Sequence, residues 1–153
     1  MKLSLLNAWT DGLRQGFKMT VNAGLMRMAK KEWGTARELG LPMTFHQNPP
    51  GQIREIHNAG YLGRDIVPVH ANLAADDELE ALAAVGGGIS FTTEGEFAGG
   101  RAMNIIGRAH RAGVKPSLGV DIPSRVALDL FAQMHLTFRS EEHTSELQSR
   151  LHL

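Results

Sequence analysis

The sequence predicts an α/β protein with a parallel sheet, arranged as part of a (β/α)8 barrel. Short apolar runs alternate with longer segments whose apolar residues recur at helical spacing. Repeated strand–helix units of this kind imply parallel strands joined by right-handed crossovers. The intervals between the runs are those that neighbouring barrel strands would give, and four units make half of a barrel. The four runs span 42–46, 66–70, 88–92 and 113–121.

The first half of the chain contains two of these units. Glycines interrupt residues 1–24, so we expect a poorly defined segment of loop and short helix there. Helical spacing of apolar residues predicts a helix over 25–39, which Gly40 ends. The elements expected next are a strand ending at His46, a helix over 52–59, a strand over 66–70 and a helix over 76–85.

The second half contains the other two units. Residues 88–92 predict the third strand, and the polar residues 93–96 predict a loop after it. A helix is expected over 102–112, then a fourth strand that ends on Asp121, and a last helix over 124–138. The glycines at 86–88 precede their strand, whereas a phosphate-binding loop must follow one. A doubly wound nucleotide-binding domain is therefore not expected.

The composition excludes several partners and several kinds of chemistry. Sixteen basic and 16 acidic side chains give a formal net charge of zero, which argues against a nucleic-acid or membrane-surface partner. Because the chain has no cysteine, disulfides, thiolate metal ligands and a cysteine nucleophile are excluded. The first residues lack the apolar region of a signal peptide, and no apolar run is long enough to cross a membrane. We therefore expect a cytoplasmic protein.

Three of the predicted strands end on side chains that can bind a metal ion or move a proton. His46 and His70 end the first two strands, and Asp121 ends the fourth. The carboxyl ends of parallel strands in α/β folds open onto one face, where the active sites of such folds lie. We expect these three side chains to meet around one metal ion or one reacting atom. Glu94 faces the same end and is either a substrate-binding residue or a solvated loop acid.

Three segments of the chain carry a family resemblance. They are His-Ala-Asn-Leu-Ala-Ala-Asp-Asp-Glu at 70–78, Ser-Leu-Gly-Val-Asp at 117–121 and Asp-Leu-Phe-Ala-Gln-Met at 129–134. With them, residues 25–138 resemble the amidohydrolase superfamily, in particular its cytosine deaminase and chlorohydrolase-like metal-dependent hydrolases. The resemblance implies that the four units are the second half of a (β/α)8 barrel.

The resemblance also implies a reaction and a role for each candidate residue. His46 would be a metal ligand, His70 would contact substrate or metal-bound water, and Asp121 would both approach the metal and shuttle a proton. Glu94 would bind substrate. The implied cofactor is a divalent zinc or iron, both of which accept imidazole and carboxylate ligands. The implied reaction is hydrolysis or deamination of a small molecule at a carbon–nitrogen bond, by attack of metal-bound hydroxide.

The sequence departs from the family pattern at two points. No two histidines are separated by a single residue, so the paired His-x-His that supplies two ligands in the family is missing. Pro49 stands three residues after His46, where several relatives have a catalytic glutamate. Because a catalytic zinc usually has three protein ligands, we expect this chain alone to be inactive.

The chain end and the sheet edges give the last expectations. Residues 139–153 leave the apolar pattern and resemble a translated sequencing adapter, so we interpret them as a non-native tail. Half a barrel has two open strand edges, which favour association of two copies or aggregation. The alternative function is a non-catalytic α/β binding or assembly module, which would form a stable oligomer without hydrolase activity.

Overall fold

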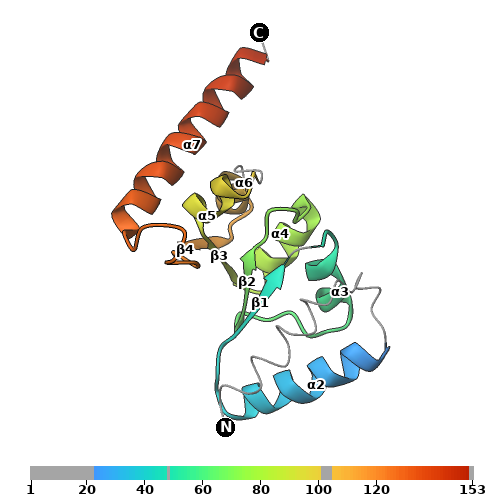
Figure 1. Ribbon diagram of the computed structural model, residues 1–153. Coiled ribbons are helices and arrows are strands. Elements are labelled where there is room, and N and C mark those ends of the chain that lie inside the picture. The colour runs from blue at the N-terminus through green and yellow to red at the C-terminus, as the bar shows by residue number, and fades with distance from the viewer. Residues whose placement is uncertain (1–22, 48, 101–104, 152–153) are drawn as a thin grey trace.

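The computed structural model describes residues 23–47, 49–100 and 105–151. Its centre is a four-stranded sheet in which each strand runs parallel to its neighbours, in the order β1-β2-β3-β4 (Figure 1). The strands are β1 (Met43–Gln47), β2 (Ile66–His70), β3 (Gly88–Phe91) and β4 (Lys115–Leu118). The helices are α2 (Ala23–Glu38), α3 (Gln52–Asn58), α4 (Asp76–Ala84), α5 (Thr93–Ala98), α6 (Ile105–Arg111) and α7 (Leu130–Leu151).

The strand order identifies the sheet as part of a barrel. Each strand pairs with the next one along the chain, and a helix lies between them in sequence. A doubly wound sheet would reverse its strand order at a switch point, whereas a (β/α)8 barrel does not. The predicted partial barrel of four βα units is thus confirmed. Of the predicted poorly defined segment 1–24, only the part from Ala23 onward is described, and it is helical; residues 1–22 lie outside the described residues.

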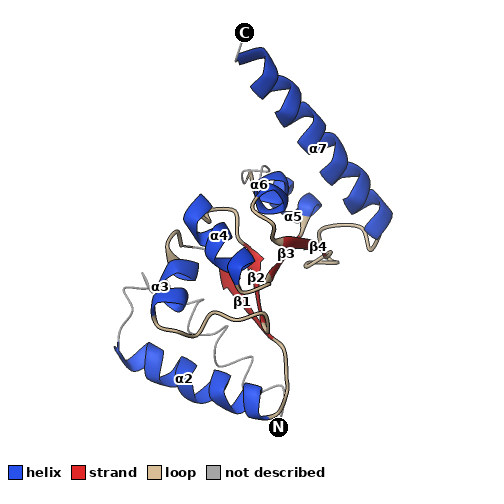
Figure 2. Ribbon diagram, turned by 180° about the vertical axis from the view of Figure 1, so that it is seen from behind, coloured by secondary structure: helices blue, strands red, loops and turns tan. Residues whose placement is uncertain are grey.

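The hydrophobic core lies between one face of the sheet and the crossover helices. Alternate strand residues are buried, as in the pattern of β2, because successive side chains point to opposite faces. Helices α3, α4 and α6 lie beside the sheet (Figure 2). Their apolar side chains and the buried strand residues belong to one cluster. The members from strands and these helices are Met43, Phe45, Ile53, Ile56, Ile66, Leu79, Leu82, Ile89, Phe91, Ile105 and Ala109.

The opposite face of the sheet is more exposed. His46, Val69 and Ser90 occupy paired positions on three neighbouring strands, and each is half-buried. In a closed barrel this face would be the packed interior. The helices of the described residues therefore cover the outer face of the partial barrel, and the inner face carries His46.

Helix α2 packs against the sheet through aromatic side chains and one ion pair. The ring of Trp33 lies 6.2 Å from both Phe45 and Tyr61, measured between centroids. Arg37 donates from Nε and Nη2 to the carboxylate of Asp65, at 2.6 and 3.1 Å, and from Nη2 to the carbonyl of Tyr61 at 2.6 Å. Hydrogen bonding by Arg37 holds the pKa of the Asp65 carboxyl below its ordinary value. This pair fixes α2 to the segment that enters β2.

The Asp65 pair predicts a pH-dependent contribution to stability. Because the pKa of Asp65 is lower in the folded chain, its contribution is complete above the ordinary pKa of aspartate and is lost as the pH falls through the lower, folded value. We expect Asp65→Asn to reduce the free energy of unfolding by about 0.5–1 kcal/mol at pH 7. The difference from wild type should shrink steadily below about pH 4. Urea unfolding at a series of pH values measures it, with the exposed Glu80→Gln as control; a difference that persists at pH 2 would contradict the ion-pair explanation.

Several predicted boundaries are wrong. Residues 93–96, expected as a loop, form the first part of helix α5. The fourth strand ends at Leu118 instead of Asp121, since the ladder finishes where Gly119 N donates to Phe91 O and the chain then turns. The last helix begins at Leu130 instead of residue 124, because Asp129 caps it by accepting from the backbone N–H groups of Phe131 and Ala132.

Helix α7 also continues past Phe138, where its predicted end lay, to Leu151. Its polar side packs on α5 and α6: Thr137 contacts Thr93, and Glu141 accepts from Gly107 N at 3.0 Å. The helical conformation of 139–151 does not test whether these residues are a non-native tail, and that interpretation stays a prediction.

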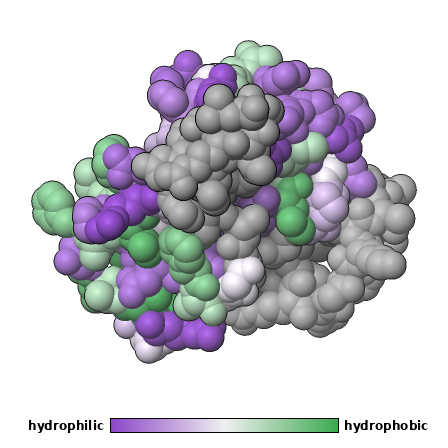
Figure 3. Space-filling view, turned by 90° about the horizontal axis from the view of Figure 1, so that it is seen from above, coloured by the Kyte–Doolittle hydropathy of each residue, from purple (hydrophilic) through white to green (hydrophobic). Residues whose placement is uncertain are grey.

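A second side of α7 is apolar and exposed. Phe131 is 81% exposed and Phe138 is 64% exposed. Met134 lies between these two residues at helical spacing, and Leu130 directly precedes Phe131. Both are also exposed. Hydrophobic residues gather on the side of the molecule where α7 begins, at the left in Figure 3. Among the described helices, none is long and apolar enough to cross a membrane.

Candidate active site

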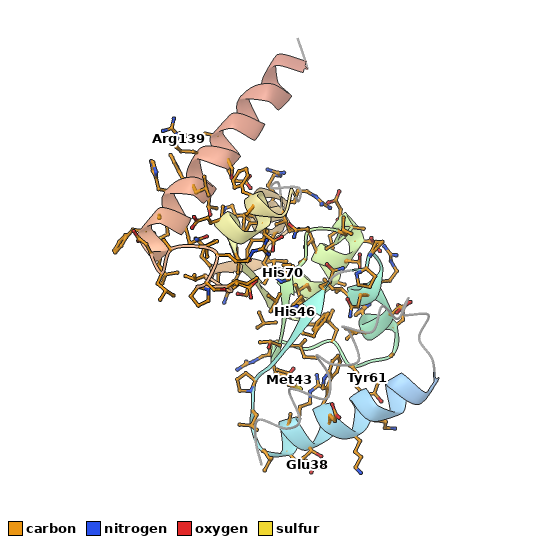
Figure 4. The ribbon with its side chains drawn as sticks, in the orientation of Figure 1. Glu38, Met43, His46, Tyr61, His70 and Arg139 are labelled. Carbon is orange, nitrogen blue, oxygen red and sulfur yellow. The ribbon has the colours of Figure 1, made fainter. Side chains whose placement is uncertain are left out.

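The carboxyl ends of β1 and β2 bring two histidines together. His46 is the fourth residue of β1, His70 is the last residue of β2, and the centroids of their rings lie 4.9 Å apart with the ring planes perpendicular. Figure 4 shows the two labelled side chains close to each other at the centre of the molecule. His46 is half-buried and His70 is 5% exposed. The expected meeting of these two side chains thus occurs.

An unusual backbone turn orients His70. Its φ is 70°, and that of Ala71 is 53°, so two successive residues with a Cβ atom adopt the left-handed conformation. Such a conformation costs roughly 1–2 kcal/mol for each residue and is common at functional sites. In the strand register His70 pairs with Gln47, a position on the buried face, whereas His46 pairs with Val69 on the inner face. The turn at His70 allows its ring to meet that of His46 despite their different faces.

A buried carboxylate completes the surroundings of His70. Glu96, from α5, is 1% exposed, and its Oε1 lies against Nδ1 of His70 as an ion-pair contact. The same carboxylate accepts from Asn72 Nδ2 at 2.7 Å and from Thr92 Oγ1 at 3.2 Å. Each oxygen of Glu96 thus has at least one polar neighbour in the protein. A buried carboxylate with this many partners is held in one orientation.

Sequence reasoning missed Glu96 and Asn72. Residues 93–96 were expected to form a loop, and in a loop the carboxylate of Glu96 would be solvated. In the helix α5, Glu96 lies one turn after Thr92 and faces the sheet. The signal that was available is the pair of acidic residues in the first turn of a short helix, where the helix dipole favours them. Which of the two acids is buried depends on packing and could not be inferred from spacing.

The structure places Glu94 and Asp121 apart from this network. The backbone N–H of Glu94 donates to Oε1 of Gln133 on α7 at 2.9 Å, and Gln133 donates back to the Glu94 carboxylate at 3.0 Å. Asp121 is exposed, in the loop after β4, with a φ of 66°. Aspartate tolerates this left-handed conformation better than most residues. The substrate-binding role of Glu94 and the catalytic and metal roles of Asp121 stay predictions.

The carboxylate of Glu78 holds the loop that follows β1. Glu78 is fully buried at the start of α4, and it accepts from the backbone N–H groups of Gly51 at 3.2 Å, Arg54 at 3.0 Å and Ala75 at 3.0 Å. These donors lie at the N-terminal ends of α3 and α4, where backbone N–H groups have no partner within their helix. One side chain therefore links the loops that follow His46 and His70.

The described residues do not complete a metal site. In the ranges 23–47, 49–100 and 105–151, no group of three or more histidine, aspartate or glutamate side chains could hold a metal ion. The two histidines supply at most two imidazole ligands, and one ring nitrogen of His70 already faces Glu96. Because a catalytic zinc usually takes three protein ligands, the set that the described residues offer does not fit one.

The fold and the site together define part of a (β/α) barrel with two histidines in contact at the ends of neighbouring strands. No protein-family model matches the chain, and no curated protein matches it in sequence. Solved structures do match. An amidohydrolase from an environmental sample of the Sargasso Sea aligns with a TM-score of 0.65 and 24% identity, over 77% of this chain and 27% of that one.

Two further matches are hydrolases of triazines. A triazine hydrolase variant aligns with a TM-score of 0.57 and 14% identity, over 65% of this chain and 24% of that one. The zinc complex of the atrazine chlorohydrolase TrzN from Arthrobacter aurescens TC1 gives a TM-score of 0.55, 15% identity and the same coverages. The chain spans about a quarter of the length of these proteins. At these identities the comparisons establish the fold alone.

Proposed function

We propose that this chain is a part of a metal-dependent hydrolase that acts on carbon–nitrogen bonds other than peptide bonds. The observation that supports the proposal most is the contact of His46 and His70 at the carboxyl ends of neighbouring parallel strands. Deamination of a cyclic amidine or a nucleobase-like small molecule is the reaction that the resemblance favours. A cytoplasmic location is part of the same proposal.

In this proposal the candidate residues keep separate roles. His46 supplies one ligand to a divalent zinc or iron, and His70 contacts the substrate. Asp121 acts as a second ligand and proton carrier, and Glu94 contacts the substrate from α5. When bound, such an ion would lower the pKa of a coordinated water and polarise the substrate. Because the described side chains do not complete the site, the remaining ligands must come from outside them, and this chain alone is expected to be inactive.

We also propose that two copies associate through the open edge of the sheet and the apolar side of α7. Among the described residues β4 pairs on one edge only, with β3, and α7 packs beside β4. Exposed Phe131, Met134 and Phe138 then extend the same surface. A second copy is the occupant that would pair the edge and also bring the number of strands to the eight of a closed barrel.

Elemental analysis of the purified chain, with its mass measured by light scattering during size-exclusion chromatography, tests these proposals. We expect well below one equivalent of zinc or iron per chain, together with a dimer or larger assembly. One tightly bound ion per chain would contradict the inactive-fragment proposal. A monomer would contradict association of two copies, and an extended protein that never binds metal would favour the assembly module.

The hydrolase proposal itself needs a longer gene product. The source DNA should be read across both ends of the coding region and the extended protein assayed for release of ammonia from cyclic amidines. We expect turnover that His46→Asn reduces at least about 100-fold, since it removes a metal ligand. An extended protein that folds, binds metal and is unaffected by His46→Asn would contradict the assignment of this residue.

A further inference from the structure

We propose that Glu96 is a positioning residue that fixes the tautomer of His70, with the ring proton on Nδ1 and Nε2 presented as a hydrogen-bond acceptor. The inference starts from the ion-pair contact between Glu96 Oε1 and Nδ1 of His70. An ionised carboxylate has only acceptor lone pairs. We therefore assign the hydrogen to the nitrogen that it touches, because two lone pairs in contact would repel each other.

The other contacts of Glu96 support the ionised, acceptor-only form. Asn72 Nδ2 and Thr92 Oγ1 both lie within hydrogen-bonding distance of its two oxygens, and an amide nitrogen can only donate. A protonated Glu96 would instead donate its hydrogen to Nδ1 of His70 and leave the ring hydrogen on Nε2. In the proposed form the network runs in one direction, from Asn72, Thr92 and His70 toward the carboxylate.

Burial makes this arrangement rigid. Glu96 is 1% exposed, Thr92 is 4% exposed and His70 is 5% exposed, so water does not compete for the contacts. The left-handed turn at His70 and Ala71 fixes the backbone from which the ring projects. Histidines whose Nδ1 contacts a carboxylate recur at reactive and metal-binding sites. In these sites the carboxylate sets which ring nitrogen carries the hydrogen.

The consequence concerns the substrate and rests on the proposed function. A neutral imidazole with its hydrogen on Nδ1 can only accept at Nε2. His70 would then face a donor, such as the amino or ring N–H group of an amidine or an attacking water. A role as hydrogen-bond donor to a developing oxyanion would instead require a hydrogen on Nε2. The structure thus favours substrates that offer an N–H or O–H donor to His70.

The ring nitrogens of His70 report the tautomer directly. We would record the 15N chemical shifts of the histidine side chains of the full chain at pH 8, assigning His70 by its loss in His70→Asn. The expected result is a protonated, pyrrole-type Nδ1 and a bare, pyridine-type Nε2. A protonated Nε2 in the wild-type chain would overturn the proposal without any need for a variant.

A matched pair of substitutions tests the cause. In Glu96→Gln one oxygen becomes an amide donor, and Asn72 Nδ2 still requires an acceptor, so the new NH2 group must face His70. We expect the Nε2-protonated form to rise to at least half of the population. Glu94→Gln, two residues earlier on the same helix, should leave the tautomer unchanged because its carboxylate binds Gln133. An unchanged tautomer in Glu96→Gln would overturn the positioning role.

This measurement is independent of hydrolysis. It uses neither metal nor substrate, so an Nδ1-protonated His70 in a protein that never turns over an amidine would defeat the proposed function alone. Turnover by the extended protein with an Nε2-protonated His70 would defeat the positioning role alone.

Discussion

Replacing Glu78 with alanine should reduce the free energy of unfolding by about 2–4 kcal/mol. The fully buried carboxylate accepts from three backbone N–H groups, those of Gly51, Arg54 and Ala75. Hydrogen bonds to a charged group contribute roughly 1.5–3 kcal/mol each, but partial entry of water reduces the sum when all are lost together. The midpoint of urea unfolding measures the change. An unchanged dependence of the free energy of unfolding on urea concentration checks that unfolding is two-state.

A second substitution on the same helix is the control for this result. Glu80 lies two residues after Glu78 on α4 but is exposed, so Glu80→Ala should change the free energy of unfolding by less than about 0.5 kcal/mol. Glu78→Gln keeps one acceptor oxygen and should fall between the two. If Glu78→Ala and Glu80→Ala had equal effects, the carboxylate could not be the element that joins α3 to α4.

The linkage by Glu78 also matters for the candidate site. The loop that begins after β1 carries the chain away from His46, and the loop after β2 carries it away from His70. Because one carboxylate binds backbone groups in both loops, the separation of the two strand ends depends on it. We therefore expect the stability of the fold and the geometry of the histidine pair to be coupled through Glu78.

Periodicity in the sequence was sufficient to predict the sheet. Strands β1, β2 and β3 lie within one residue of their predicted bounds. Alternate residues of each strand are buried against the helices, so each strand appears in the sequence as a short apolar run. The contact of His46 and His70 followed from the rule that parallel strands open their carboxyl ends onto one face. These features depend on local pattern and on the topology that the pattern implies.

The features that sequence reasoning missed depend on tertiary packing or on capping. Leu118 and Val120 look equally suited to a strand, but the chain leaves the ladder at Gly119, and only pairing with β3 decides where it ends. The start of α7 was misplaced because the capping role of Asp129 was not considered. Glu94 and Glu96 have the same chemistry and differ only in burial, which the sequence does not reveal.

The second large effect is expected from Phe91→Ala, which should reduce the free energy of unfolding by about 3–5 kcal/mol. Phe91 is fully buried at the end of β3, between β2 and β4, and it is among the largest of the fully buried side chains. Truncation removes the transfer free energy of the ring and leaves a cavity that the surrounding strands can fill only in part. Such a loss is a large fraction of the total stability of an ordinary domain, so the variant should show a strongly lowered unfolding midpoint.

The matched control is the same substitution at Phe131, which is 81% exposed on α7. Since alanine leaves no cavity there and is a better helix former, Phe131→Ala should change the free energy of unfolding of the isolated chain by less than about 1 kcal/mol. The proposed association of two copies adds a second expectation for this variant. The Phe131→Ala dimer should dissociate at higher protein concentrations than the wild-type dimer. If Phe131→Ala were as destabilising as Phe91→Ala at a concentration where the chain is monomeric, the core would not lie where the structure places it.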